Sequence, residues 1–443
     1  MSEEQAAAPP SAEESKQPIA RAEMRDIVDL SLWAGQLQLQ HGADTERAEN
    51  TIHHLGTGLG CDWLDAFISP NAIVISTLSG GEFRTRTRRL VRFGGVDMNI
   101  VAAVNDLAYQ VEAHTADRGR IREELQEIDT MPKLYPRWLV VLLVGLACAA
   151  FSQLFGGDWA AFAVTGVAAS AAMMIRQALT GRYFNQLLVV VATAFVASFI
   201  AALGGLVQLS GKPQIALAAS VLLLVPGVQL INSSKDLLQG HMVTGIVRGL
   251  TGALITLAIA LGIGIAISLL PLTFVDADIA LPSSLLADAF WAAVAALGFA
   301  VLFNVPRGTL LGCAVCGALG HATRTFLVGA GWPGAAHIVT ATLMGATAVG
   351  TLAYLLARAY ELPTIIFALS GVIPMFPGIL AYRSMLGILQ VAGIINIGEV
   401  GPLDRLLLNE VIPNLLTTAF ILAALALGIA APTLLFRRRK PVA

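Results

Sequence analysis

The hydrophobic pattern divides the chain into two parts. From residue 138 onward, apolar runs recur at about 20 residues, the length that a helix needs to cross a bilayer. They predict ten membrane spans, at residues 138–155, 159–177, 184–208, 213–239, 242–270, 284–303, 308–328, 335–357, 363–390 and 413–436. Residues 19–137 instead show short helical and strand periodicities, which predict a water-soluble domain.

The soluble part has the pattern of a small α+β domain. Two amphipathic helices come first, the first ended by Gly42 and the second beginning after Asp44 as its N-cap. Three runs rich in β-branched residues and two further amphipathic helices follow, so the order ααβββαα is expected. Arg84, Arg86 and Arg88 alternate onto one face of the third strand, which predicts a wet sheet face or a contact to a membrane loop. Residues 1–18 offer nothing to bury and are predicted to be a disordered tail.

Two Pro-Gly pairs interrupt the predicted spans, at Pro226-Gly227 and Pro377-Gly378. Another proline precedes each pair, by 13 residues in the first case and 14 in the second. Proline removes a backbone hydrogen bond from a helix, so the freed polar groups must face protein or a water-filled cavity. The fourth and ninth spans are therefore predicted to be discontinuous. Matched breaks of this kind indicate the substrate site of a transporter built from repeats.

The number of spans sets the relation between the two halves. Five spans per half turn the second repeat upside down in the membrane, which predicts inverted repeats at 138–272 and 284–436. Arg176 in the second span has its counterpart 148 residues later in Arg324 of the seventh. The predicted fold is thus an α-helical polytopic membrane protein with ten transmembrane helices in two inverted five-helix repeats, plus the soluble N-terminal domain. We expect the two Pro-Gly breaks to meet at one central site.

Composition and charge agree with a membrane protein. The chain is 56% hydrophobic and 13% charged, with a mean hydropathy of +0.71. Residues 1–138 hold fourteen basic and twenty-one acidic residues, and this negative balance argues against nucleic acid as a partner. Basic residues, including the tail at 437–443, gather at the ends of alternate spans. By the positive-inside rule, both termini are expected in the cytoplasm and the chain in the inner cell membrane.

Charged side chains inside a span are costly, so each is a candidate site residue. Asp236 follows the first break and is a candidate proton carrier, or else a cytoplasmic-end residue paired with Lys235 or Arg248. Arg383 follows the second break, beside Tyr382, and is a candidate carboxylate ligand. The predicted substrate-binding residues are Pro226, Gly227, Asn232, Ser233, Ser234, Pro377, Gly378, Tyr382 and Arg383.

Four further residues are candidates for gating or charge pairing: Arg176, Arg248, His321 and Arg324. Arg248 has a second interpretation, in which its side chain extends to the inner membrane surface. His321 and Arg324 lie one helical turn apart and fit an outer gate, a proton-sensitive pair or an interfacial anchor.

No enzyme or metal motif stands out. Cys313-Ala-Val-Cys316 has metal-like spacing, but inside an apolar span it predicts core packing. His53-His54 with Glu49 fits a solvated helix face better than a metal site. Nucleotide-binding, nucleophile-elbow and zinc-protease motifs are absent from the sequence. Catalytic residues, metals and cofactors are therefore not expected.

Several segments together resemble the threonine/serine exporter family. They are His41-Gly-Ala-Asp-Thr-Glu-Arg-Ala-Glu49, Val225-Pro-Gly227 with Ser234-Lys-Asp236 and Gly245-Ile-Val-Arg248, Asn304-Val-Pro-Arg-Gly308, and Pro374-Met-Phe-Pro-Gly378 with Tyr382. The resemblance covers residues 22–436. It implies a cytoplasmic N-terminal domain fused to ten spans that export small hydrophilic amino acids using the proton-motive force. In some relatives the two modules are separate polypeptides associated with export of a dicarboxylate such as succinate.

The leading hypothesis is therefore a proton-coupled exporter of threonine and serine in the lipid bilayer. A dicarboxylate exporter is the alternative, because arginines outnumber strong acid candidates within the spans. A membrane-bound hydrolase acting through the soluble domain is a remote third hypothesis. Gly308-Thr-Leu-Leu-Gly312 permits close helix packing within one chain or between two, so a homo-oligomer is allowed.

Overall fold

The computed structural model describes residues 20–79, 82–90, 95–112, 117–182, 184–270, 284–330, 337–395 and 407–436. The two predicted tails, 1–18 and 437–443, lie outside these residues. The chain forms two compact units. The first unit joins the described part of Met1–Pro132 to Asp236–Val247 and to the described end of Leu434–Ala443, and the second comprises Lys133–Lys235 and Arg248–Thr433.

The first unit has the predicted order of elements. Its helices and strands are α1 (Arg21–Gln40), α2 (Thr45–Gly58), β1 (Trp63–Ile68), β2 (Ala72–Ser79), β3 (Glu82–Arg89), α3 (Met98–Glu112) and α4 (Arg118–Asp129). The strands form an antiparallel sheet in the order β1-β2-β3. The turn chemistry is as expected: Gly42 and Gly60 adopt positive φ after the first two helices, and the Asp44 side chain accepts a hydrogen bond from Arg47 N.

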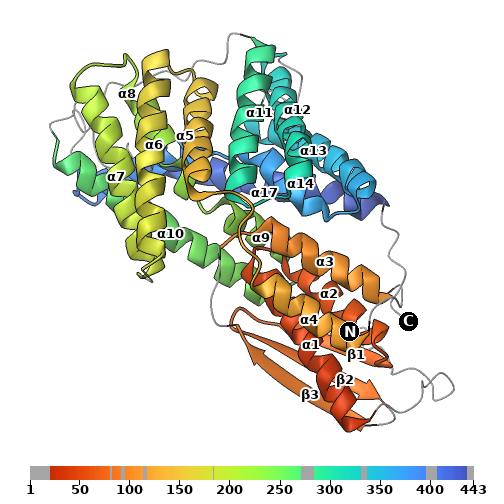
Figure 1. Cartoon of the computed structure of the whole chain (residues 1–443). Helices are drawn as coiled ribbons and strands as arrows, with labels where there is room; N and C mark the ends of the chain where they lie inside the picture. Colours follow the sequence, from red (N-terminus) through yellow and green to blue (C-terminus); the bar gives the residue numbers. More distant parts are fainter. Residues whose placement is uncertain are drawn as a thin grey trace. The chain divides into compact units, whose positions relative to one another are not determined.

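Three layers build this unit, with the sheet, then α1 and α2, then α3 and α4 (Figure 1). The inner faces of α1 and α2 meet Ile73 and Ile75 of the sheet in one apolar cluster. The opposite faces of the same helices meet Val104 and Ile121 in a second cluster. A helix pair that is apolar on two faces is expected in the middle layer, because each face covers a different neighbour.

The arginines of β3 lie against α1, so the prediction of a wet sheet face or a contact to a membrane loop was wrong. Arg86 pairs with Asp29 of α1, and the guanidinium of Arg88 lies 5.9 Å from the centroid of the Trp33 ring. Burial lowers the pKa of Arg88 from its ordinary value. The long aliphatic stems cover the helix while the charged ends reach polar partners.

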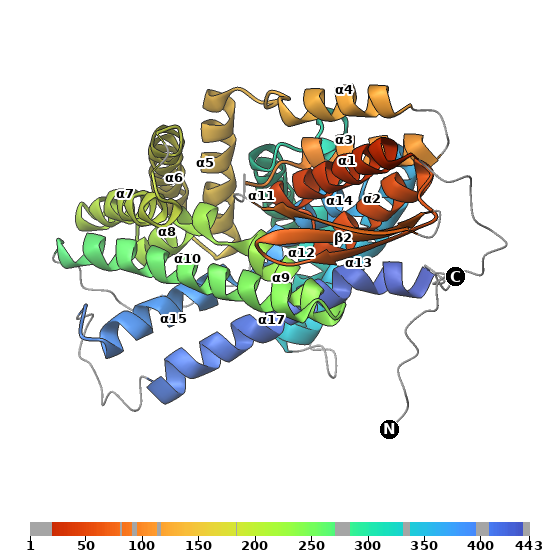
Figure 2. The same cartoon turned by 90° about the horizontal axis from the view of Figure 1, so that it is seen from below.

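The second unit is helical in its described residues. It contains α5 (Arg137–Leu154), α6 (Trp159–Thr180), α7 (Gln186–Leu206), α8 (Pro213–Ser220), the 3-10 turn η2 (Leu222–Leu224), most of α9 (Gly227–Leu238) and of α10 (Met242–Ser268), α11 (Leu285–Leu302), the turn η3 (Arg307–Thr309), α12 (Leu310–Gly329), α13 (Ile338–Tyr360), α14 (Thr364–Val372), the turn η4 (Ile373–Met375), α15 (Gly378–Val391), the π-turn η5 (Leu407–Val411) and α17 (Ile412–Phe436). Figure 2 shows α10, α15 and α17 next to one another.

Eight helices among the described residues are long and apolar enough to cross a membrane, or ten if each bent pair is one span. The two bent pairs are those predicted to be discontinuous. Pro213–Leu224 meets Gly227–Leu238 at 63°, and Thr364–Met375 meets Gly378–Val391 at 57°. The prolines therefore break the helices where the sequence indicated.

Helices α5 and α11 pack against each other in the centre of the second unit and run antiparallel. Just after α11, Val305 O accepts a hydrogen bond from Tyr135 Oη, which lies just before α5, at 2.7 Å. Towards the other end, the ring of Trp291 on α11 lies 6.0 Å from that of Trp159, which follows α5. The two halves also share a packing pattern, because α6 and α7 hold α8 as α12 and α13 hold α14.

Candidate functional site

The two Pro-Gly breaks contact each other within the second unit. A Cβ added to Gly227 would lie 3.4 Å from side-chain atoms of Ile373 and Phe376, which precede the second break. A Cβ added to Gly378 would lie 2.3 Å from Leu222 Cδ2, beside the first break. The expectation that the breaks meet is therefore fulfilled. A Cβ at Gly378 would therefore require the Leu222 side chain to shift.

A half-buried arginine holds the backbone at each break. Arg176 Nη1 on α6 donates to Leu223 O at 3.3 Å, and Arg324 Nη1 on α12 donates to Met375 O at 3.0 Å. Both carbonyls belong to the 3-10 turn before a Pro-Gly pair, where the regular helical hydrogen bonds end. Sequence analysis paired these arginines by their spacing. It did not predict that both would contact the backbone of the breaks.

Asp288, His321 and Arg324 form a chain of contacts that ends at the second break. His321 Nδ1 lies 2.8 Å from Asp288 Oδ2, and His321 Nε2 lies 2.5 Å from Arg324 Nη2. Asp288 is fully buried and His321 is 2% exposed. Asp288 Oδ1 is buried without a hydrogen-bond partner in the described part of the chain. Removing one member would leave a buried charge or polar group uncompensated.

Asp288 was not among the site residues predicted from the sequence. Only one acidic residue was considered a strong candidate within the spans. The available signal was an acid within the apolar run 284–303, four residues after the predicted start of that span. Because Ser284 caps α11 and accepts from Ala287 N, Asp288 already lies inside the helix. A charged side chain inside a span is a candidate site residue, and this principle, which selected Asp236, applies equally to Asp288.

The polar residues after the first break lie within α9. Asn232 and Ser233 are buried, and Ser233 packs close to Gly249 of α10. Ser234 Oγ donates to Leu230 O in its own helix at 3.1 Å. Ser233 therefore contributes to packing against α10, while Ser234 is hydrogen-bonded within α9.

The residues after the second break lie on α15. Tyr382 is buried in an apolar cluster with Met385 and Leu389. Its hydroxyl is one of the buried side-chain atoms that lack a hydrogen-bond partner in the described residues. A buried phenol of this kind is available to a ligand. The neighbouring Arg383 is half-buried.

Asp236 belongs to the first unit, and its Oδ1 accepts a hydrogen bond from Thr45 N, at the start of α2, at 3.1 Å. Further contacts of the α9–α10 turn include Gln239 to Glu46, His241 Nε2 to Glu49 at 3.6 Å and Thr244 Oγ1 to Ile68 O at 3.3 Å. A carboxylate at a helix N-terminus is favourable. The structure therefore gives Asp236 a contact, with Thr45 N, that the sequence did not indicate. Arg248 follows this turn on α10 and is half-buried.

The remaining candidate residues, His53, Glu49 and the cysteines, lie in ordinary packing and hydrogen-bonding environments. His53 Nδ1 lies 3.3 Å from Leu64 O, and burial raises the pKa of Glu49, although His241 partly opposes this. All four cysteines are buried, and they form no disulfide with one another. Among the described residues, no group of three His, Cys, Asp or Glu side chains has metal-binding geometry.

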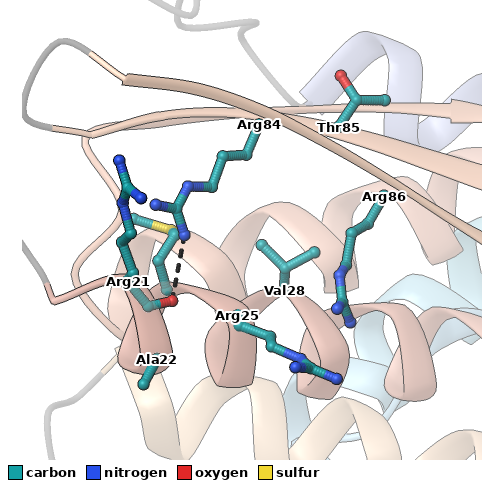
Figure 3. A pocket seen from close by; sticks show the side chains of 8 residues that line it. Arg21, Ala22, Arg25, Val28, Arg84, Thr85 and Arg86 are labelled. Carbon is teal, nitrogen blue, oxygen red and sulfur yellow. Dashed lines mark hydrogen bonds between the residues drawn. The ribbon is translucent and has the colours of Figure 1, made fainter.

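A basic pocket of about 570 Å³ lies between α1 and β3 of the first unit (Figure 3). Its arginines are Arg21, Arg25, Arg84 and Arg86. Arg84 Nη1 donates to Arg21 O at 3.1 Å, as Figure 3 shows. Guanidinium groups are suited to carboxylates and phosphates. Asp29 offsets part of the charge, because it pairs with Arg86 and lies 4.0 Å from Arg25.

The fold and the site define a multi-pass membrane protein in which two broken helices meet, an arrangement typical of secondary transporters. Two family models match the chain: threonine/serine exporter over residues 29–270, and Threonine/Serine exporter, ThrE, over residues 288–435. The chain belongs to the threonine/serine exporter family.

Curated relatives match two different extents of the chain. Proteins named probable succinate transporter subunit YjjP, from Escherichia coli and Klebsiella aerogenes, are 38% and 39% identical over 250 residues. These matches cover 56% of this chain and 96% of each relative. An uncharacterized protein of Haemophilus influenzae is 27% identical over 94% of this chain and 98% of its own length. No solved structure matches the chain.

Proposed function

We propose that the protein is a secondary active exporter of small carboxylate-bearing metabolites, driven by the entry of protons. The observation that carries the proposal is the contact between the two Pro-Gly breaks, each held by a half-buried arginine. A broken helix offers backbone groups and helix ends to a solute inside the membrane, which an unbroken helix does not. Transport, rather than catalysis, is the use of such a site.

Inverted repeats are part of the proposal. Support comes from the antiparallel packing of α5 and α11, the helices that begin the two halves. The contacts of Arg176 and Arg324 give further support, because residues 148 apart reach equivalent turns. Rocking of one half against the other would expose the breaks to each side in turn.

Threonine and serine are the first substrates to test, because the chain belongs to the family with that name. A dicarboxylate is the second candidate, and the names of the YjjP relatives favour it. Both substrates carry a carboxylate, for which Arg383 and the Tyr382 hydroxyl are the proposed ligands. The amino acids also need an acceptor for their ammonium group. Asn232, Ser233, Ser234 and the backbone at Pro226, Gly227, Pro377 and Gly378 are the proposed acceptors and lining.

We place the protein in the bacterial inner membrane with both termini in the cytoplasm. The positive-inside distribution of Lys and Arg supports this orientation. The N-terminal unit is proposed to act on transport and not as a hydrolase. A homo-oligomer stays a prediction based on the small-residue pattern at Gly308-Thr-Leu-Leu-Gly312.

The test uses purified protein in liposomes loaded with labelled threonine, serine or succinate. Efflux is measured with and without an imposed proton gradient, and protein-free liposomes provide the background. Efflux of threonine or serine that the gradient accelerates is the expected result. Succinate efflux alone would establish the second candidate, and a lack of efflux for all three solutes would contradict the proposal.

A further inference from the structure

We propose that Asp288 and His321 form the proton-binding site of this transporter, and that Arg324 transmits the proton's arrival to the second helix break. The inference rests on the proposed function for its role in transport. The contacts from which it is argued do not depend on the identity of the substrate. Asp288, His321, Arg324 and Met375 O form one continuous series of contacts inside the second unit.

The donors and acceptors of this series determine the tautomer of His321. A guanidinium group only donates hydrogen bonds, so His321 Nε2 must accept from Arg324 Nη2. The other ring nitrogen, Nδ1, then carries the hydrogen and donates it to Asp288 Oδ2. His321 is therefore neutral in this conformation, between a carboxylate and a guanidinium group. The three side chains together have no net charge.

One added proton disrupts this arrangement. When His321 Nε2 takes a proton, the imidazole becomes an imidazolium whose two nitrogens both donate, and Nε2 can no longer accept from Arg324. Two cations would then lie 2.5 Å apart, a separation that a buried site does not tolerate. The guanidinium must move. Because its Nη1 also donates to Met375 O, that movement removes a hydrogen bond from the turn before Pro377.

The Asp288 carboxylate can accept the proton in the next step. Its Oδ2 lies 2.8 Å from His321 Nδ1, so the proton that leaves Nδ1 of the imidazolium passes to Oδ2. Its Oδ1, buried without a hydrogen-bond partner in the described residues, is not needed by another donor there. Protonated Asp288 is neutral and donates a hydrogen bond instead of carrying a buried charge. The pair thus alternates between holding and releasing one proton.

The surroundings contain few competing charges. Thr325 Oγ1 lies 3.4 Å from His321 Nδ1. On the elements packed against α11 and α12, the charged residues are Arg137 of α5, Arg307 of η3 and Arg358 of α13, while α14 and η4 have none. These three arginines lie towards the opposite ends of the helices, near the end of α11 and the start of α12. The other ionisable groups on the packed elements are the thiols of Cys148, Cys313 and Cys316 and the phenols of Tyr354 and Tyr360.

The first half lacks an equivalent pair. At the same spacing of 148 residues, Asp288 corresponds to Val140, and His321 corresponds to Met173. Arg176 is retained and holds Leu223 O, so the break contact is common to both halves. In the described part of the chain, the titratable pair is linked to the second break and not to the first. The geometry therefore assigns proton sensing to one half and leaves the other break independent of pH.

The transport experiment compares wild-type protein with Asp288→Asn and His321→Gln in the liposomes described above. Gradient-driven efflux of the two variants is expected to fall to background, while exchange of labelled for unlabelled solute continues, because exchange needs no net proton movement. His337→Asn is the matched control: His337 caps α13 by accepting from Val339 N, and asparagine preserves that cap. Gradient-driven efflux at the wild-type level in both variants would overturn the inference while leaving the proposed function intact.

A second measurement does not depend on transport. Hydrogen exchange in the peptide that contains Phe376 and Gly378 is followed at acidic and neutral pH and expressed as protection relative to the intrinsic rate. Protection is expected to fall at acidic pH in wild-type protein and to be independent of pH in His321→Gln. The peptide with Val225 and Gly227 is the internal control, because its protection should not vary. Wild-type protection at Phe376 that is independent of pH would refute the link, whether or not any solute is transported.

Discussion

Gly378 lies at the contact between the two broken helices. A Cβ at this position would lie 2.3 Å from Leu222 Cδ2, so Gly378→Ala must push the two breaks apart or displace Leu222. We expect a loss of roughly 1–3 kcal/mol from overpacking and a marked fall in transport. Thermal unfolding and liposome efflux measure these effects. Gly329→Ala is the control, since nothing lies within 4 Å of the added Cβ, and equal effects in the two variants would contradict the prediction.

Glu49 and Glu23 of the first unit should respond to pH with opposite signs. Burial raises the pKa of Glu49 above 4.5, so its contribution to stability is full below the usual pKa and is lost as pH rises through the folded-state value. The hydrogen bond and charge of Arg118 lower the pKa of Glu23, whose contribution is present above the usual pKa and is lost on acidification.

Glutamine variants test this difference. Glu49→Gln imitates the protonated carboxyl, so its unfolding temperature should match wild type in acid and exceed it as pH approaches neutrality. Glu23→Gln should match wild type in acid and fall below it at neutral pH. Thermal unfolding of the full chain across this pH range measures both. Shifts of the same sign in the two variants would show that these surroundings do not control stability.

At the scale of elements, Asp158 joins the start of α6 to the loop before α8. Its Oδ1 accepts from Ala161 N at 2.6 Å and from Ser210 Oγ at 2.8 Å, and its Oδ2 accepts from Gly211 N at 2.9 Å. Burial acts to raise its pKa, but these hydrogen bonds outweigh burial, so the pKa lies below the usual value.

Loss of this carboxylate should therefore destabilise the second unit. We expect Asp158→Ala to cost about 1 kcal/mol through the helix cap alone, with a further loss from the loop. Asp158→Asn retains an acceptor and should lose less. Chemical denaturation at neutral pH compares the two variants. A cost for asparagine equal to that for alanine would argue that charge, and not the cap, determines stability here.

Sequence patterns were sufficient for the elements and insufficient for their contacts. Length and periodicity predicted the order of helices and strands in the N-terminal unit, the candidate spans and the two bends, because proline and bilayer thickness impose local constraints. They did not predict that Asp236 would accept from Thr45 N, because this contact joins segments 191 residues apart. They also did not predict that Asp288 lies beside His321. Asp288 falls near the predicted start of a span, and its burial depends on where that span begins. The surroundings of the β3 arginines were predicted wrongly for a different reason: alternation along a strand does not reveal which face of the sheet a helix covers.

At the scale of the whole molecule, the two halves of the second unit should assemble even when the chain is divided. The YjjP relatives match 56% of the chain over 96% of their own length, so a polypeptide that resembles only part of this chain exists elsewhere. In this chain the halves meet along α5 and α11, where an added Cβ on Gly298 would lie 2.4 Å from Leu143 O. Such close backbone contact holds helices together in a membrane without a connecting segment.

We therefore expect residues 1–270 and 284–443, produced together as two polypeptides, to purify as one complex and to transport the same solute as the intact chain. A tag on the first polypeptide and detection of the second measure assembly, and liposome efflux measures function. Gly298→Leu is the discriminating variant, because it separates α5 from α11 and should abolish co-purification. Assembly that survives Gly298→Leu would place the essential contact elsewhere. Failure of the unmodified polypeptides to assemble would mean that the covalent connection is required, in contrast to the separate YjjP relatives.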